Sequence, residues 1–110
     1  MRTAPKALSS EEITERLKPL PEWSVERVDS ASELKRVYRF ASFEAVLDFM
    51  LAAAKEIAAA DHHPRWENVY NELRVHLSTH SIGNRLSDLD FRIATHLEDL
   101  YSGKYRPSTA

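Results

Sequence analysis

The sequence "SFEAVLDFMLAAAKEIAAADHHP" (residues 42–64) joins a long apolar segment to two histidines and a proline. Its apolar side chains recur at intervals of three and four residues, at Phe43, Val46, Leu47, Met50, Ala54 and Ile57. This period is typical of one face of an α-helix. The sequence therefore predicts a helix that starts at Ser42 and ends at about residue 60, just before the histidines.

The residues before this helix predict a shorter helix and a β-hairpin. Ser9 and Glu12 have the spacing of a capping box, which predicts a helix from about residue 10 to 18. The segments "WSVERV" (23–28) and "ELKRVYRF" (33–40) are rich in β-branched and aromatic residues, with "DSAS" between them. This pattern predicts two antiparallel strands joined by a turn.

The residues after the long helix predict one more strand and a last helix. In "NVYNELRVHLST" (68–79) apolar and polar side chains alternate, which predicts a single half-buried strand. The segment "SIGNR" (81–85) interrupts this pattern. Ser87 then starts a helix with Asp88 and Asp90 in its first turn, where the helix dipole favours carboxylates.

The predicted order of elements is α-β-β-α-β-α. Strands grouped between helices, with a hairpin first, indicate an α+β fold in which a small antiparallel sheet carries helices packed on one face. A chain of 110 residues suits one domain, 1–110. We expect its tail "KYRPSTA" (104–110) to be loose.

Composition excludes several classes of function. The chain has 15 Lys and Arg against 17 Asp and Glu, so we expect neither a nucleic acid nor a membrane as partner. It has no cysteine, which excludes disulfides, thiolate metal sites and a cysteine nucleophile. It has no signal-like segment and no apolar run of about 18 residues, so we predict a cytoplasmic protein with a small, polar ligand.

The five histidines divide by their place in the predicted elements. His62 and His63 follow the long helix, and His80 follows the next predicted strand. These three lie at element ends, where functional sites are commonly built. His76 and His96 lie inside elements on polar faces, where a structural role is the simpler reading.

Three imidazoles could bind zinc, but their spacing favours an organic ligand. Adjacent residues at a helix end diverge by about 100°, so His62 and His63 do not easily aim at one ion. Histidine gives or takes a proton near neutral pH, which suits acid/base chemistry on a bound molecule. Trp66 and Tyr70 could supply a flat apolar wall, or could simply be part of the core.

The segment "DHHPRWENVYNELRVHLSTH" (61–80), followed by "LSDLD" (86–90), resembles the signature of the pterin-4a-carbinolamine dehydratases. That signature combines an HH-P step, an aromatic residue, a later T-H pair and a final Asp. The resemblance covers residues from about 8 to 101. It implies a hydro-lyase that converts 4a-hydroxytetrahydropterin to quinonoid dihydropterin and water in tetrahydrobiopterin recycling, without metal or organic cofactor.

The resemblance also implies roles for individual residues. His62 and His80 would be the acid/base residues beside C4a of the pterin, with the division of acid and base left open. His63 would bind and position the ring, and Asp90 would orient a histidine or bind a polar edge of the substrate. The predicted catalytic set is thus His62, His63 and His80, and the predicted substrate-binding set is Asp61, Trp66, Thr79 and Asp90.

The chain departs from the family pattern at two places. Ala58 stands where the family usually has an ionisable residue, and Glu56, two residues earlier, is rotated by about 200° on the helix. Between His80 and Asp90 the chain is one residue longer than the commonest members. We expect both departures to affect which pterin is bound and how tightly.

A non-catalytic pterin-binding module or dimerisation scaffold is the alternative function, and a homodimer or homotetramer is expected in either case.

Overall fold

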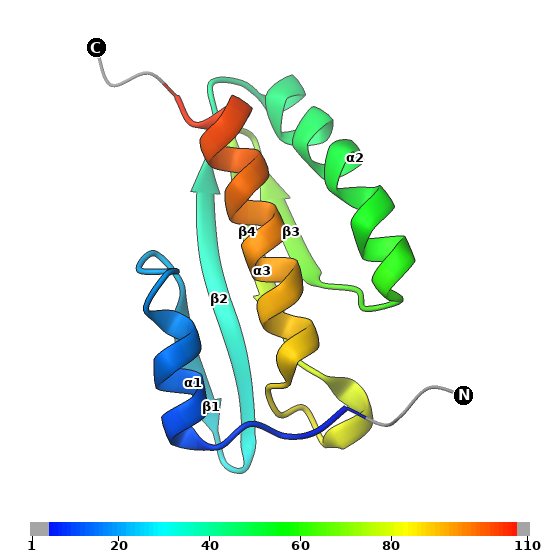
Figure 1. The fold of residues 1–110 in the computed structure, drawn as a ribbon. Helices are drawn as coiled ribbons and strands as arrows, with labels where there is room; N and C mark the ends of the chain where they lie inside the picture. Colours follow the sequence, from blue (N-terminus) through cyan, green and yellow to red (C-terminus); the bar gives the residue numbers. More distant parts are fainter. Residues whose placement is uncertain (1–4, 108–110) are drawn as a thin grey trace.

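The computed structural model describes residues 5–107, which form a four-stranded antiparallel sheet with helices on one face (Figure 1). The strand order is β1-β2-β4-β3. The main elements are α1 (Ser10–Leu17), β1 (Ser24–Val28), β2 (Ala31–Arg39), α2 (Phe43–Ala60), β3 (Arg65–Val69), β4 (Glu72–Leu77) and α3 (Asp88–Leu100). A 3₁₀ turn, η1 (His80–Ile82), precedes α3, and a π-helical turn, η2 (Tyr101–Tyr105), follows it. The predicted α+β class, with helices packed on one face, is confirmed.

Side-chain caps fix where the helices begin and end. Ser9 and Glu12 form the predicted capping box at α1, and Ser87 and Asp90 form a second one at α3. In each box the side chains satisfy backbone N–H groups that have no partner within the helix. At the C-terminal end of α2, Asp61 adopts a left-handed conformation, with φ of 49°, which turns the chain out of the helix.

The prediction of a single strand over residues 68–79 is wrong, because this region contains a β-hairpin. β3 and β4 pair through a tight turn at Tyr70 and Asn71, where Tyr70 has φ of 51°. The amide of Asn68 stabilises the turn by donating to the carbonyl oxygens of Tyr70 and Glu72, at 3.1 and 2.9 Å. The turn pairs Val69 with Glu72, so the alternation of side chains changes phase there, but no glycine or proline marks the turn and the sequence pattern did not reveal it.

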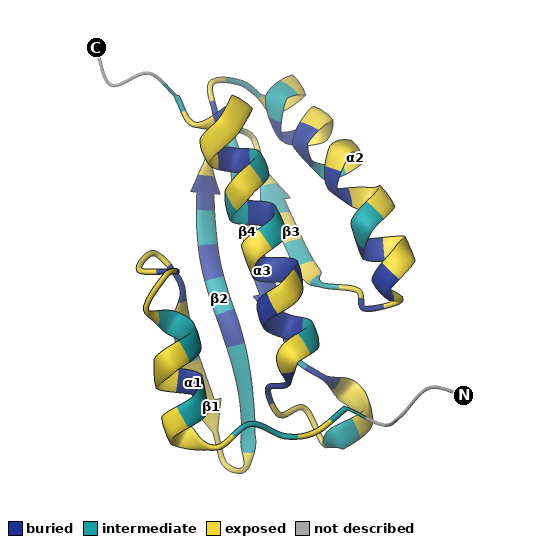
Figure 2. Ribbon diagram, in the orientation of Figure 1, coloured by how far each residue is buried: buried dark blue, intermediate teal, exposed yellow. Residues whose placement is uncertain are grey.

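The face of α2 that enters the core differs in part from the prediction. The buried residues of the helix are Val46, Phe49, Ala53, Ile57 and Ala60. Of the predicted stripe, Phe43, Leu47 and Ala54 are exposed instead (Figure 2). Apolar residues surround most of this helix, so periodicity alone allows two overlapping stripes. The core selects the stripe that contains the Phe49 ring, whose centroid lies 5.3 Å from that of Tyr38 on β2.

The predicted loose tail is wrong at its first residues. Tyr105 is buried, and its hydroxyl donates a hydrogen bond of 2.7 Å to Asp48 on α2. This bond lowers the pKa of the Asp48 carboxyl, because it stabilises the charged form. The rest of the predicted tail includes residues 108–110, which lie outside the described residues.

A half-buried carboxylate, that of Glu98, ties the sheet to α3. Oε1 of Glu98 accepts hydrogen bonds from Trp23 Nε1 at 2.9 Å, Arg36 Nε at 2.7 Å and the Tyr38 hydroxyl at 3.0 Å. The Arg36 guanidinium also lies 4.2 Å from the centre of the Tyr38 ring. Burial, followed by the charge of Glu98, raises the pKa of Tyr38 well above its ordinary value.

The fold brings several element ends together at one end of the sheet. Because β3 and β4 are antiparallel, Arg65 at the start of β3 lies opposite His76 near the end of β4. The turn η1 and the C-terminal end of α2 therefore lie on the same side of the molecule (Figure 1).

Within residues 5–107, no helix has the length and hydrophobicity needed to cross a membrane.

Candidate functional site

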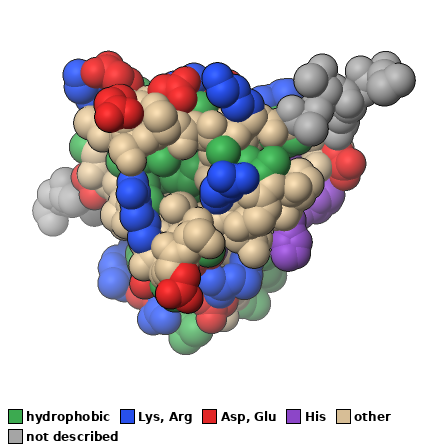
Figure 3. Space-filling model, turned by 90° about the horizontal axis from the view of Figure 1, so that it is seen from below, with side chains coloured by type: hydrophobic (Ala, Val, Ile, Leu, Met, Phe, Trp, Pro, Cys, Tyr) green, Lys and Arg blue, Asp and Glu red, His purple; other side chains and the backbone are tan. Residues whose placement is uncertain are grey.

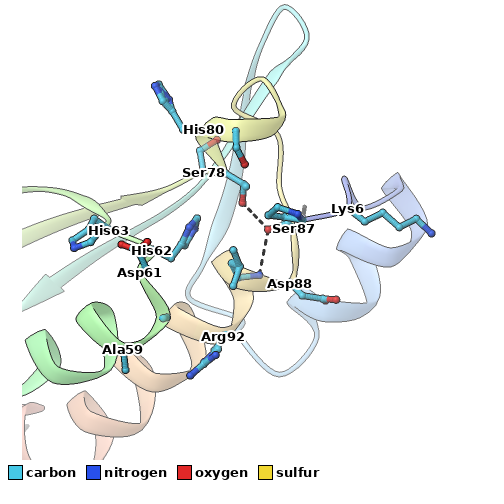
Figure 4. A pocket seen from close by; sticks show the side chains of 15 residues that line it. Lys6, Ala59, Asp61, His62, His63, Ser78, His80, Ser87, Asp88 and Arg92 are labelled. Carbon is cyan, nitrogen blue, oxygen red and sulfur yellow. Dashed lines mark hydrogen bonds between the residues drawn. The ribbon is translucent and has the colours of Figure 1, made fainter. Parts of the chain in front are cut away.

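A cavity of about 620 Å³ lies where the end of α2, the end of β4 and the start of α3 meet (Figure 4). Its size falls in the range that holds a small organic molecule. Figure 3 shows histidine side chains gathered at one edge of the surface, beside an acidic group. The residues that line the cavity include most of the predicted site residues, namely Asp61, His62, His63, Thr79 and His80.

His62 is held by a buried carboxylate. Its Nε2 lies 2.6 Å from Oδ1 of Asp90, whose side chain is fully buried. A carboxylate can only accept, so the Nε2–H of His62 donates to Asp90 and its Nδ1 is left for other contacts. The carboxylate also compensates positive charge on the ring whenever His62 is protonated. Of the two roles predicted for Asp90, the geometry fits the orientation of a histidine.

Asp90 is itself fixed by a chain of hydrogen bonds through two buried hydroxyls. Thr79 Oγ1 donates to Asp90 Oδ2 at 2.7 Å, and the backbone N–H of Ser87 donates to the same oxygen at 2.9 Å. Since the hydroxyl hydrogen of Thr79 is used on Asp90, the Ser87 hydroxyl donates to Thr79 Oγ1 at 2.6 Å. Thr79 thus lines the cavity with its hydroxyl already engaged. Ser87 was missed as a site residue, because its sequence signal is that of a helix cap alone.

The two adjacent histidines diverge. His62 is buried, whereas His63 is exposed and its ring points to the other side of the chain (Figure 4). The left-handed conformation of Asp61 starts this divergence, because it turns the chain directly after the helix. His63 and Asp61 therefore lie on the open wall of the cavity, where they can contact a ligand directly.

His80 reaches the same cavity from η1, directly after Thr79. It is exposed, and its Nδ1 lies 3.1 Å from Oδ1 of Asn84. The three rings thus differ in their surroundings: one is buried on a carboxylate, one is exposed, and one is exposed with an amide partner. Asn84 was also missed as a site residue, because its partner His80 precedes it by four residues across a turn that the sequence did not define.

The two predicted aromatic residues do not line the cavity. Trp66 on β3 is half-buried and packs against the core, as the simpler of the two readings had it. Tyr70 is 68% exposed at the turn between β3 and β4. That turn is at the opposite end of the two strands from His62 and His80, so the structure does not bring Tyr70 to the site.

The rim of the cavity beside α2 carries an ion pair between Glu56 on α2 and Arg92 on α3. Glu56 accepts from Arg92 Nε at 3.0 Å and from Arg92 Nη2 at 2.9 Å, and Arg92 lines the cavity. Ala58 is exposed and does not line it, whereas Ala59 does. Glu56 therefore approaches the cavity through Arg92 and does not occupy the place of Ala58.

The remaining histidines lie apart from this cavity. His76 on β4 is buried between Glu33 and Glu67, at 3.1 and 3.3 Å, on the sheet face opposite the helices. His96 on α3 does not line the cavity. Within residues 5–107, no three histidine or carboxylate side chains are arranged to hold a metal ion. The cavity instead combines a buried, carboxylate-bound imidazole with two exposed ones, which can move protons to and from a bound molecule.

Comparisons with known proteins agree on one family. Residues 6–100 match the family model described as pterin 4 alpha carbinolamine dehydratase. The chain is 36% identical over 96 residues to a protein of Opitutus terrae named "Putative pterin-4-alpha-carbinolamine dehydratase", covering 87% of this chain and 95% of that protein. A protein of Synechococcus with the same name is 42% identical over 81 residues, covering 74% of this chain and 82% of that protein.

Two solved structures have a similar fold. The crystal structure of a transcriptional coactivator/pterin dehydratase from Brucella melitensis has a TM-score of 0.77 and 34% identity, covering 86% of this chain and 98% of that one. A pterin dehydratase-like protein described as a RuBisCO assembly factor of the alpha-carboxysome has a TM-score of 0.59 and 16% identity, covering 72% and 88%. At that identity the second likeness concerns the fold alone.

Proposed function

The chain belongs to the pterin-4a-carbinolamine dehydratase family, and we propose that it converts 4a-hydroxytetrahydropterin to quinonoid dihydropterin and water, as in tetrahydrobiopterin recycling. One observation carries the proposal. His62, buried on Asp90 at 2.6 Å, and the exposed His80 both line a cavity large enough for a pterin. Two histidines in unlike surroundings suit a reaction that needs an acid and a base at once.

In the proposed mechanism, His62 is the acid and His80 is the base. The protonated His62 gives its Nδ1 proton to the 4a-hydroxyl, the C4a–O bond breaks, and water leaves. His80 takes the N5 proton, and the electron pair of the N5–H bond forms the C4a–N5 double bond. Asp90 stabilises the protonated form of His62, which is the form that must be present before the hydroxyl leaves. One proton is released and one taken up, so solvent restores both histidines.

The other predicted residues act by binding and positioning. His63 and Asp61 lie on the open wall of the cavity, and we propose that they contact the pterin ring. Thr79 contributes through its hydrogen bond to Asp90. Trp66 packs against the core and does not line the cavity, so we assign it no contact with the substrate.

The test is dehydration of 4a-hydroxytetrahydropterin, followed by absorbance, with the uncatalysed rate subtracted. His62→Ala and His80→Ala should each lower the rate by about 10²- to 10⁴-fold, the usual contribution of general acid/base catalysis. His96→Gln is the matched control, since His96 does not line the cavity. If His62→Ala and His80→Ala both keep the wild-type rate, catalysis by these residues is refuted. If the wild type itself does not exceed the uncatalysed rate, the chain is a non-catalytic module, and titration with a fluorescent pterin would show whether it binds pterin.

We also propose that the chain is one cytoplasmic domain that forms a homodimer or homotetramer. Exposed Phe43, Leu47 and Leu51 follow one another at four-residue intervals on α2, with exposed fractions of 41%, 46% and 76%. Side chains four apart share one helix face, so these three form a continuous apolar stripe on the outside of the molecule. Light scattering at micromolar concentration tests the proposal. A monomer under those conditions would contradict it, and Leu51→Lys should weaken an oligomer that uses this stripe.

A further inference from the structure

The loop that carries His80 is closed by its own backbone. At its base, Thr79 N donates to Arg85 O at 2.9 Å, and inside it Gly83 N donates to His80 O at 3.1 Å. The loop is also tied to the β1–β2 hairpin, since Ser32 N donates to Asn84 O at 2.8 Å. These bonds hold the backbone of His80 and the backbone of Asn84 in one fixed relation.

The conformation of Asn84 turns its side chain back to His80. Its φ is 58°, in the left-handed region, which asparagine tolerates better than most residues. Its Oδ1 lies 3.1 Å from Nδ1 of His80. An amide oxygen can only accept, so this contact requires a hydrogen on Nδ1 and leaves the lone pair of the neutral ring on Nε2.

We propose that Asn84 is a positioning residue that holds neutral His80 in its Nδ1–H tautomer, with Nε2 as the proton-accepting atom. In free histidine the Nε2–H tautomer predominates, so the contact with Asn84 selects the less common form. His62 is held the opposite way, because its Nε2–H donates to Asp90. The two histidines are therefore fixed in complementary tautomers, in which Nδ1 of neutral His62 and Nε2 of neutral His80 carry the free lone pair.

The tautomer is measured first, and this measurement does not depend on any activity. Long-range ¹H–¹⁵N spectra of the full chain, at a pH where His80 is neutral, distinguish the two forms through the nitrogen shifts of the ring. The wild type should show Nδ1–H at His80, and Asn84→Gly should shift the population toward Nε2–H. Glycine is the suitable replacement, because it removes the side chain and still accepts a positive φ. An Nε2–H ring in the wild type, which would mean that the amide nitrogen faces His80, overturns the proposal.

The catalytic consequence rests on the proposed function and is tested by a double-mutant cycle. Asn84→Gly should lower kcat about three- to tenfold, the range expected from one ordinary hydrogen bond. In the His80→Ala background the same change should have no further effect, because Asn84 acts through His80. A purely structural role would instead lower kcat equally in both backgrounds, and that result overturns the proposal.

Asn84→Asp provides the rescue. It keeps an oxygen acceptor for the Nδ1–H and retains the tautomer, so kcat should stay within about threefold of the wild type. This loss is smaller than the one expected of Asn84→Gly. Its negative charge favours protonated His80, so the acidic limb of the pH profile should move to higher pH. An unmoved profile counts against the contact. If the wild type shows no dehydration at all, the proposed function fails, whereas the tautomer measurement still decides the role of Asn84.

Discussion

Replacing Asp90 by asparagine removes one negative charge from the site and keeps the shape of the side chain. Asp90 accepts from His62 Nε2 on one oxygen, and from Thr79 Oγ1 and Ser87 N on the other. The asparagine can keep the latter two bonds with its carbonyl oxygen. Its NH₂ group must then face His62, which forces Nε2 of the ring to become the acceptor.

The expected loss of activity follows from the lost charge and the changed tautomer. A hydrogen bond to a charged group contributes about 1.5–3 kcal/mol, and each 1.4 kcal/mol corresponds to about a tenfold change. Asp90→Asn should therefore lower kcat roughly ten- to hundredfold, since it removes the group that stabilises protonated His62. The free energy of unfolding should fall by only about 1–3 kcal/mol, because the hydrogen bonds from Thr79 and Ser87 are retained.

The assay is dehydration of 4a-hydroxytetrahydropterin, with urea unfolding measured on the same samples. Asp99→Asn is the matched control, because Asp99 is exposed on the same helix and does not line the cavity. It should leave kcat within about twofold, as expected of an exposed substitution away from the site. The reasoning is refuted if folded Asp90→Asn keeps the wild-type kcat, or if Asp99→Asn lowers kcat by as much.

Three further predictions concern stability. Thr79→Val removes the buried hydroxyl that donates to Asp90, and urea unfolding should show a loss of about 1–3 kcal/mol, with Thr79→Ser close to the wild type. Phe49→Ala empties a fully buried site and should cost about 3–5 kcal/mol by the same method; a loss below about 1 kcal/mol would contradict the packing described. Burial and Glu98 raise the pKa of Tyr38 above its ordinary 10.0. The contribution of the protonated Tyr38 hydroxyl to stability should therefore be complete below pH 10 and decline above it. Tyr38→Phe should flatten that decline in melting curves measured at different pH values.

The sequence predicted the parts of the fold that depend on local signals. The helix starts at Ser9 and Ser87 were predictable because a capping side chain and its backbone partner lie within three residues of each other. The first hairpin was predictable from its two β-rich segments. The turn at Tyr70 was not, because neither glycine nor proline marks it in the sequence. The buried face of α2 was only partly predicted, because the choice between its two stripes is made by the aromatic core.

The sequence by itself determined which chemical groups this protein has for its site: three histidines at element ends, a carboxylate in the first turn of the last helix, and no cysteine. Only the tertiary structure decided how they differ. It buries His62 and brings it into hydrogen-bonding contact with Asp90, which lies 28 residues later in the sequence. It leaves the neighbouring His63 exposed. The physical reason is that the charge and tautomer of an imidazole depend on the atoms within hydrogen-bonding distance, and folding brings those atoms from distant parts of the chain.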